Sequence, residues 1–179
     1  YSGEPESRLL DPACGSGTFL VEAIRRVRTR WADEHGSRDA RPAQLLRTIT
    51  QGIAGVDLNP LAVLTARANC LMAIRDLLPQ VGCARVARAA RRPVLNTGRQ
   101  AVSATLPVHQ GDSILGQPEG LDARLGQFDF IVGNPPWIAW DHLPCEYREA
   151  TKPLWQHYGL FTLSGTEARH GGGKKDLSM

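Results

Sequence analysis

The feature that most limits the fold of this chain is a short apolar run, residues 128–132, that is soon followed by two consecutive prolines. The run is aromatic and β-branched and has no helical period, which is typical of a buried strand. Pro135 and Pro136 end it because proline has no backbone N–H for a strand ladder, and the following proline holds Asn134 extended. We therefore predict a strand and a stiff loop that presents an amide, a carbonyl and the ring of Trp137. These groups can hold a planar heterocycle that carries an amino group.

Three further apolar runs are each followed by an acidic residue. The segments end in Asp11, Asp57 and Asp112, and the third is the weakest as a strand. The three predicted strands are residues 8–11, 52–57 and 106–112. Each strand therefore delivers one carboxylate at its carboxyl end.

Helical periodicity separates these strands. After the first strand, apolar residues recur at offsets of four, seven and eleven, which places them on one helical face. They are Leu20, Ile24, Val27 and Trp31. Asn59 and Pro60 are the residue types preferred at the N-cap and in the first turn of a second helix, whose predicted apolar stripe is Leu61, Leu64, Ala68 and Leu71. We also expect a short helix near residues 42–47, and one over residues 146–155 that is interrupted at Pro153.

Strands that alternate with helices predict an α/β fold, with a parallel sheet and helices on both faces. In such sheets, ligands bind outside the carboxyl ends of the strands, near the point where the strand order reverses. The polar residues that follow the four predicted strands should therefore share one rim of the sheet.

The length of 179 residues predicts one domain, residues 1–179, with a sizeable core. No run of 18 apolar residues is present, which argues against a membrane span, and no secretory signal is visible. Arginines accumulate over residues 80–105, where acids are absent. We interpret that segment as a loop or insertion that either contacts phosphates or is simply solvated. Residues 138–179 form a separate segment after the Asn-Pro-Pro-Trp motif.

The four cysteines show neither C-x-x-C spacing nor a cluster with histidine, so we predict no metal site. Without a secretory signal, reduced thiols and a cytoplasmic location are expected. Cys14 lies between motif residues, and we interpret it as a small buried residue rather than a nucleophile.

A glycine turn, residues 15–17, follows the first predicted strand. A dinucleotide fingerprint would need a third glycine where this chain has Leu20. An acid so close to the turn, Asp11, disfavours a pyrophosphate and favours a ligand with positive charge and hydroxyl groups. S-adenosylmethionine has a sulfonium, an ammonium and a ribose diol. It would fit if Asp57 accepts from the ribose hydroxyls and Asp112 from the adenine amino group.

Four motifs together resemble the amino-methylating DNA methyltransferases, most of all the adenine-specific enzymes of bacterial restriction-modification and phage-defence systems. The motifs are Asp-Pro-Ala-Cys-Gly-Ser-Gly-Thr-Phe-Leu from residue 11, Gly-Val-Asp-Leu-Asn-Pro from residue 55, Gly-Asp-Ser-Ile-Leu from residue 111 and Gly-Asn-Pro-Pro-Trp from residue 133. The resemblance covers residues 9–137. It implies a Rossmann-like, S-adenosylmethionine-dependent methyltransferase fold. The implied reaction is methyl transfer to the exocyclic amino group of adenine in DNA, with the target base flipped out.

The resemblance also implies roles for residues by their positions in these motifs. The cofactor-binding set is Asp11, Ala13, Gly15, Gly17, Thr18, Phe19, Asp57, Leu58, Asp112, Ser113 and Asn134. Within it, the first acid and the two glycines would contact the methionine part of the cofactor. The catalytic set is Asn134, Pro135, Pro136 and Trp137. Asn134 and Pro135 would hold the target amino group, and Trp137 would stack on the target ring.

The chain departs from the family's pattern in two ways. Trp137 stands where the family more often has Tyr or Phe, although an indole still stacks on a base. The family's sheet has about seven strands and this chain supplies about four, so we expect a catalytic-domain fragment that lacks the upstream cofactor lid and the sequence-reading domain. The expected partners are double-stranded DNA and a restriction nuclease, a specificity subunit or the missing flanking domains, with no membrane.

The amino nitrogen of adenine is a poor nucleophile because its lone pair is delocalised into the ring. If the Asn134 side-chain oxygen and the Pro135 carbonyl accept its two N–H bonds, the nitrogen becomes pyramidal, and direct transfer needs no strong general base. Similar loops occur in enzymes that methylate ribosomal-RNA guanine or a protein glutamine amide, so both substrates stay open as alternatives. A non-catalytic fragment or assembly subunit is a further alternative.

Overall fold

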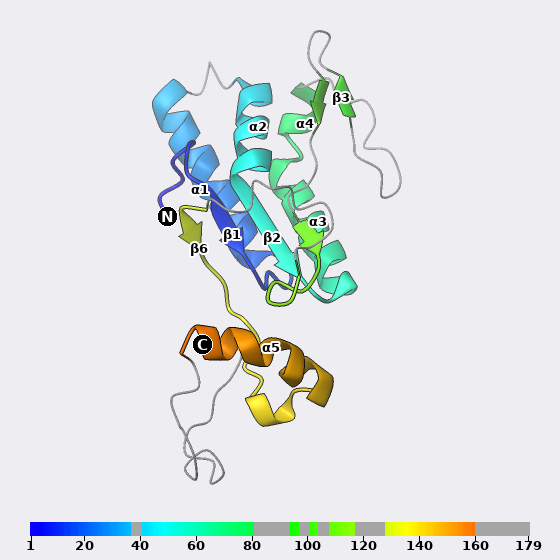
Figure 1. Ribbon diagram of the computed structural model, residues 1–179. Coiled ribbons are helices and arrows are strands. Elements are labelled where there is room, and N and C mark those ends of the chain that lie inside the picture. Colours follow the sequence, from blue (N-terminus) through cyan, green and yellow to red (C-terminus); the bar gives the residue numbers. More distant parts are fainter. Residues whose placement is uncertain (37–40, 81–93, 97–100, 104–107, 117–127, 160–179) are drawn as a thin grey trace. The chain divides into compact units, whose positions relative to one another are not determined.

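The computed structural model describes residues 1–36, 41–80, 94–96, 101–103, 108–116 and 128–159 (Figure 1). The chain forms two compact units. The first comprises residues 1–113 and 117–133, and the second comprises residues 114–116 and 134–179. The five arginines of segment 80–105 lie outside the described residues. The division of the chain predicted from the sequence stays a prediction.

The first unit is built on a four-stranded parallel sheet with the strand order β5-β2-β1-β6. The strands are β1 (Leu9–Asp11), β2 (Ile53–Asp57), β5 (Val108–Gln110) and β6 (Phe130–Ile131). Leu9 is in register with Ile53 on one side and with Phe130 on the other. From β1 the chain proceeds outward to β2 and β5 and then returns to the other side of β1 as β6. The strand order therefore reverses between β1 and β6, where α/β sheets bind their ligands. The predicted parallel α/β sheet is confirmed.

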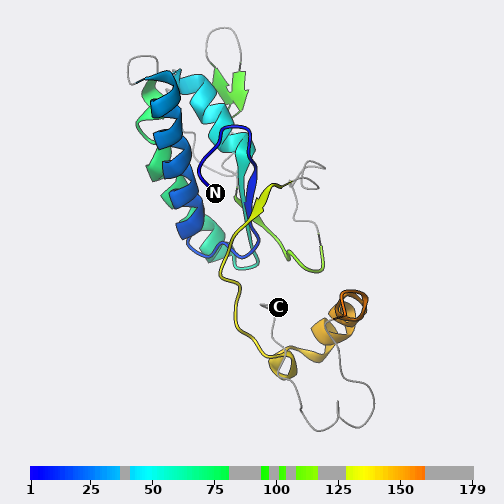
Figure 2. The same ribbon diagram turned by 90° about the vertical axis from the view of Figure 1, so that its left-hand side faces the viewer.

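Four helices of the first unit accompany this sheet. They are α1 (Thr18–His35), α2 (Pro42–Gly52), α3 (Pro60–Ile74) and the short α4 (Leu77–Gln80). Figure 2 shows α1 and α3 side by side against one face of the sheet. All four residues of the apolar stripe predicted for α1 are buried. Gly36 ends this helix with φ at +71°, and its N–H donates to the Ala32 carbonyl.

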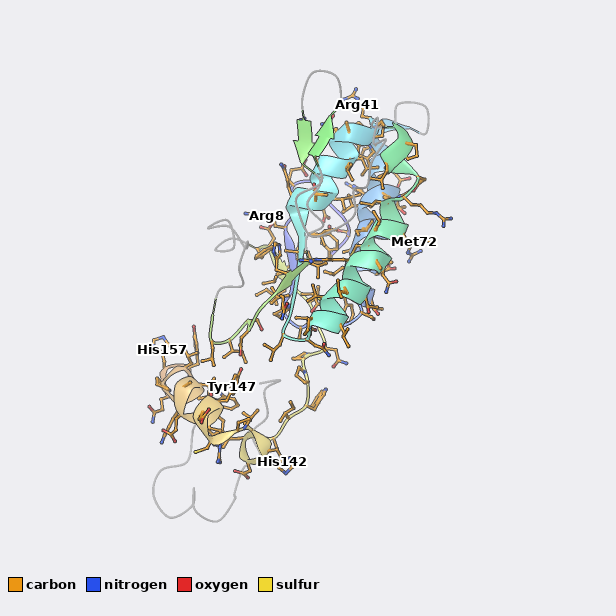
Figure 3. All side chains as sticks on the ribbon, turned by 90° about the vertical axis from the view of Figure 1, so that its right-hand side faces the viewer. Arg8, Arg41, Met72, His142, Tyr147 and His157 are labelled. Carbon is orange, nitrogen blue, oxygen red and sulfur yellow. The ribbon has the colours of Figure 1, made fainter. Side chains whose placement is uncertain are left out.

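Helix α3 begins as predicted, with the Asn59 side chain accepting from the N–H of Leu61 at 2.9 Å. The apolar stripe predicted for it is wrong, because Leu61 and Leu64 are 70% and 60% exposed. The buried face consists instead of Val63, Ala66, Cys70 and Ile74. Met72, labelled in Figure 3, is another large apolar residue on the exposed side. The helix is apolar on two faces, so spacing alone could not tell which one faces the sheet.

Arginines on the outer face of α1 are held by nearby acids. Glu22 pairs with Arg25 and Arg26, at 2.8 and 3.0 Å. Arg28 pairs with Asp76 at 2.6 Å and also donates to the Ala73 carbonyl, which ties α1 to the end of α3. Exposed pairs of this kind contribute about 0–1 kcal/mol each. Their main effect is that these guanidinium groups already have acceptors within the protein.

The remaining elements are short. Strands β3 (Val94–Asn96) and β4 (Ala101–Ser103) form an antiparallel pair. The second unit contains a 3-10 helix, η2 (Trp140–His142), and helix α5 (Cys145–His157). The predicted interruption at Pro153 is wrong, because α5 continues through it. Trp155 is buried two residues further on and packs edge-to-face on Trp140, with ring centroids 4.8 Å apart, which holds the part of the helix that follows the proline. None of the helices in the described ranges is both long and apolar enough to span a bilayer.

Candidate functional site

The glycine turn connects β1 to α1 at the carboxyl end of the sheet. Gly15 and Gly17 have φ values of +52° and +81°, a region that side-chain-bearing residues avoid. A Cβ on Gly17 would also lie 3.0 Å from the Cβ of Ala66, so the turn packs closely on α3. The Cys14 N–H donates to the Val56 carbonyl at 2.9 Å, which fastens the turn to β2. The turn is thus packed on α3 and bonded to β2, and the N–H groups of Cys14, Gly15 and Gly17 all donate to acceptors within the protein.

Cys14 is a packing residue, as predicted. It is 5% exposed, and its side chain lies against the space in which Gly55 has no Cβ. Burial raises the pKa of its thiol to about 12, and Asp11 and Asp57 reinforce the rise. The thiol is therefore protonated at neutral pH and is a poor nucleophile.

Asp57, at the end of β2, receives two backbone hydrogen bonds. The Gly15 N–H donates to its Oδ2 and the Asn59 N–H to its Oδ1, both at 2.8 Å. The carboxylate thus links the glycine turn to the start of α3. An ionised carboxylate has about four acceptor positions, so Asp57 keeps the capacity for two further donors, such as a vicinal pair of hydroxyls.

Asp11, at the end of β1, is fully buried. Its Oδ1 accepts from the Ala13 N–H at 3.1 Å, while its Oδ2 has no hydrogen-bond partner among the described residues. Burial raises the pKa of this carboxyl from 3.8 to about 6. The hydrogen bond from Ala13 lowers the pKa, and the nearby charge of Asp57 raises it further. A buried acceptor without a donor is costly, so this oxygen marks a place where a cationic or hydrogen-bond-donating ligand group would be stabilised.

The other predicted cofactor residues of the first unit follow the same strand ends. Asp112 and Ser113 follow β5 after Gly111, and Gln110 of that strand is in register with Asp57. Phe19 and Leu58 are 41% and 64% exposed, although both are large and apolar. Apolar side chains left exposed next to a polar rim are suited to cover the flat part of a ligand.

The loop that follows β6 begins beside the Asp11 carboxylate. The Val132 N–H donates to the Leu10 carbonyl at 2.9 Å, which extends the pairing of β6 with β1 beyond the assigned strand. Gly133 comes next, and a Cβ on it would lie only 2.8 Å from Oδ1 of Asp11. Gly133 is the last residue of the first unit. The root of the Asn-Pro-Pro-Trp loop is therefore fixed at the switch point between β1 and β6.

The loop itself, from Asn134 onward, belongs to the second unit. Trp137 is 75% exposed, which leaves its ring available for stacking. Its indole N–H donates to the Asn134 side-chain oxygen at 3.3 Å. Pro136 accepts from the Ile138 N–H at 3.0 Å, so the loop is a tight turn.

Every predicted cofactor residue except Asn134 thus belongs to the first unit, and Asn134 follows its last residue, Gly133. Sequence reasoning missed Gly133 as part of the site. A glycine that directly follows a β-branched strand is the signal that could have pointed to a close backbone approach. It also missed that Asp57 binds the glycine turn, because side chains far apart in the sequence carry no local sign of pairing. No three metal-binding side chains come together anywhere in the described ranges.

The rim fits S-adenosylmethionine by three observations. Among the described residues no donor reaches the buried Oδ2 of Asp11, Asp57 retains acceptor positions, and a Cβ on Gly15 would meet nothing within 4 Å, which leaves room for a ligand at the turn. A positively charged ligand with hydroxyl groups would satisfy both acids. A pyrophosphate would be repelled by them.

Residues 2–139 match the family described as RMKL-like, methyltransferase domain. The type II methyltransferase M.PaeR7I of Pseudomonas aeruginosa is 28% identical over 161 residues, which are 87% of this chain and 23% of that protein. The adenine-specific methyltransferase PglX of Streptomyces coelicolor is 37% identical over 71 residues, or 40% of this chain and 6% of that protein. The type II methyltransferase M.BstVI of Geobacillus stearothermophilus is 27% identical over 158 residues, or 86% of this chain and 24% of that protein. The chain thus spans less than a quarter of the length of each of these relatives.

Proposed function

This chain belongs to the RMKL-like methyltransferase domain family, and we propose that it transfers a methyl group from S-adenosylmethionine to the exocyclic amino group of adenine in DNA. One observation carries the proposal. The glycine turn, the buried Asp11 carboxylate and the root of the Asn-Pro-Pro-Trp loop meet at the switch point of the sheet. The similarity to PglX, which is described as adenine-specific, supports the choice of adenine.

S-adenosylmethionine supplies an electrophilic methyl group when it is bound. The chain's part is to hold and orient that ligand. Asp11 would face its positive charge, Asp57 its ribose hydroxyls and Asp112 its adenine amino group. Phe19 and Leu58 would cover its apolar surface.

The target adenine would be held by the Asn-Pro-Pro-Trp loop. The Asn134 side-chain oxygen and the Pro135 carbonyl would accept the two N–H bonds of the amino group, which localises the nitrogen lone pair. The indole N–H of Trp137 occupies the same Asn134 oxygen. The target amino group would replace the indole there, and this exchange would free the ring to stack on the base.

The magnitudes are sufficient without a general base. Well-oriented reactants reach effective molarities of about 10⁵–10⁸ M, or roughly 7–11 kcal/mol of the barrier. Flipping a base out of the duplex costs a few kcal/mol. Stacking on an aromatic side chain returns about 1–3 kcal/mol per base, so it roughly offsets the flipping cost. Orientation therefore supplies most of the rate, and phosphate contacts supply the remaining binding.

Trp137 provides the first test of the target side of the site. Because its ring is exposed and stacking contributes about 1–3 kcal/mol, we expect Trp137→Ala to weaken binding of duplex DNA by about 5- to 150-fold. We expect Trp137→Phe, which keeps a stacking ring but lacks the indole N–H, to stay within about fivefold of the wild type. Fluorescence anisotropy with a labelled duplex measures both. Equal binding by the wild type and the alanine variant would show that Trp137 takes no part in recognition.

Labelled methyl transfer tests the proposal as a whole. The chain is incubated with methyl-labelled S-adenosylmethionine and, in separate reactions, with duplex DNA, ribosomal RNA and protein carrying glutamine. We expect label in DNA. Label in RNA or protein instead would move the assignment to guanine or glutamine methylation, and no label with any of the three would favour a non-catalytic role.

The proposed setting is a restriction-modification or phage-defence system in the cytoplasm. The relatives M.PaeR7I and M.BstVI, described as type II methyltransferases, support it. We propose double-stranded DNA as the main partner, and a restriction nuclease, a specificity subunit or flanking domains as protein partners.

A further inference from the structure

Gly133 is required at its position for a steric reason rather than a conformational one. Its φ is outside the left-handed region that glycine alone tolerates, since the described glycines in that region do not include it. The obstacle to a side chain is the Asp11 carboxylate, because an added Cβ would lie 2.8 Å from Oδ1 and 3.6 Å from Cγ. Approaches under 3.0 Å are essentially never seen for real Cβ atoms, so one of the two groups would have to move.

Movement of the Asp11 carboxylate would disturb its other contacts. Asp11 is fully buried, and its Oδ1 also accepts from the N–H of Ala13, which lies two residues before the glycine turn. On the other side, the Val132 N–H holds the start of the loop on the Leu10 carbonyl at 2.9 Å. A shift of the carboxylate would therefore disturb Ala13, and a shift of Gly133 would displace the residue that follows it, Asn134.

Other closely packed glycines of the unit serve a different purpose. Gly17 and Gly55 approach Ala66 and Leu20, which are buried apolar residues of the helices. The Gly55 contact joins β2 to α1, and the Gly17 contact joins the start of α1 to α3. A Cβ on Gly133 would instead meet the titratable carboxyl group of Asp11, and it would lie 3.5 Å from Cδ of Pro12.

We infer that Gly133 is a positioning residue that couples residues 13–17, which include the glycine turn, to the Asn-Pro-Pro-Trp loop through the Asp11 carboxylate, an inference that rests on the proposed function. Oδ1 of Asp11 accepts from the Ala13 N–H and also fills the space that a Cβ on Gly133 would need. Oδ2 is left for the ligand. A ligand that binds Asp11 thereby fixes the position of Gly133, and with it the residue that holds the target base.

The test compares Gly133→Ala with Gly116→Ala, a matched control because a Cβ on Gly116 would meet nothing within 4 Å. We expect Gly133→Ala to weaken S-adenosylmethionine binding in calorimetry by at least about tenfold and to shift the Ala13 amide resonance in a ¹⁵N-resolved spectrum. The kcat for DNA methylation should fall further than the loss of cofactor affinity explains, because the target loop is displaced as well. Gly116→Ala should leave all three at wild-type values.

The outcomes separate the inference from the proposed function. If the wild type binds S-adenosylmethionine and Gly133→Ala binds it equally well with an unshifted Ala13 resonance, the coupling is refuted and the proposed function stands. If the wild type itself does not bind this cofactor, the proposed function fails and the coupling fails with it.

A second comparison covers the case in which Gly133→Ala folds poorly. In an Asp11→Ala background the methyl group has room, so adding Gly133→Ala should lower the thermal midpoint no more than Gly116→Ala does. An equally large loss of midpoint in both backgrounds would show that the glycine is needed for some contact other than Asp11, and would overturn the inference.

Discussion

Replacing Asn134 by alanine is expected to lower the kcat of methyl transfer by at least about 100-fold, the usual effect of removing one preorganised hydrogen-bonding group from a reacting centre. The affinity for S-adenosylmethionine should change by no more than about threefold. The reason is a division of roles in which the first unit holds the cofactor and Asn134 acts on the target nitrogen. Calorimetry gives the affinity, and single-turnover transfer of labelled methyl groups to DNA gives the rate.

Asn134→Asp is the matched control for this experiment. It keeps a side-chain oxygen that can accept from the target amino group and from the Trp137 indole, and it replaces the amide NH₂ with the second oxygen of a negatively charged carboxylate. We expect it to retain more activity than Asn134→Ala. Loss of cofactor binding and of transfer together in the alanine variant would contradict the division of roles.

Replacing Asp11 by asparagine is expected to change how stability depends on pH. The pKa of this carboxyl is raised by burial to about 6 from 3.8, so the folded protein holds this proton more tightly than the unfolded chain does. The resulting stabilisation is fully present below about pH 4 and is lost as the pH rises to about 6. At roughly 1.4 kcal/mol per pH unit, the wild type should lose on the order of 2–3 kcal/mol between these limits relative to Asp11→Asn.

The comparison with Asp11→Asn isolates this effect. Any cost of burying the amide does not depend on pH, and the titration of other groups is common to both proteins. Urea unfolding at pH 4, 5, 6 and 7.5 measures the free energy of unfolding of each. A constant difference between the two proteins across this range would mean that Asp11 titrates normally.

Asp11→Asn should also weaken binding of S-adenosylmethionine by at least about tenfold at pH 7.5, because it removes the charge that faces the ligand's positive groups. In the wild type the affinity should fall as the pH is lowered through about 6, where Asp11 becomes protonated. The variant should show no such dependence. The same residue would then lower stability at neutral pH and support function, as residues of binding sites often do.

The arrangement of the sheet could be predicted from the sequence because local signals agreed. The residues that form β1, β2 and β6 belong to apolar runs followed by polar residues, whereas β5 had the weakest signal, and the helical spacing of Leu20 and Trp31 matched the buried face of α1. The glycine turn and the Asn59 cap have strong local requirements for φ or for a side-chain acceptor. Features with such requirements can be predicted from the types of a few neighbouring residues.

Two kinds of feature could not be predicted in this way. Helix α3 has two apolar faces, and only packing against the sheet decides that Ala66 is buried and Leu64 is exposed. The contact between Asp57 and Gly15, which are far apart in the sequence, left no local sign. The roles of Asp112, Pro135 and the other predicted site residues remain predictions.

The central claim is that the carboxyl ends of β1, β2 and β6 form one binding rim for S-adenosylmethionine. The most direct test is a titration of the ¹⁵N-labelled chain with this cofactor, followed by the backbone amide resonances. The account predicts that the largest shifts occur at Ala13, Gly15, Asn59 and Gly133. Unchanged resonances at these four positions, with saturable shifts elsewhere in the chain or none at all, would contradict it.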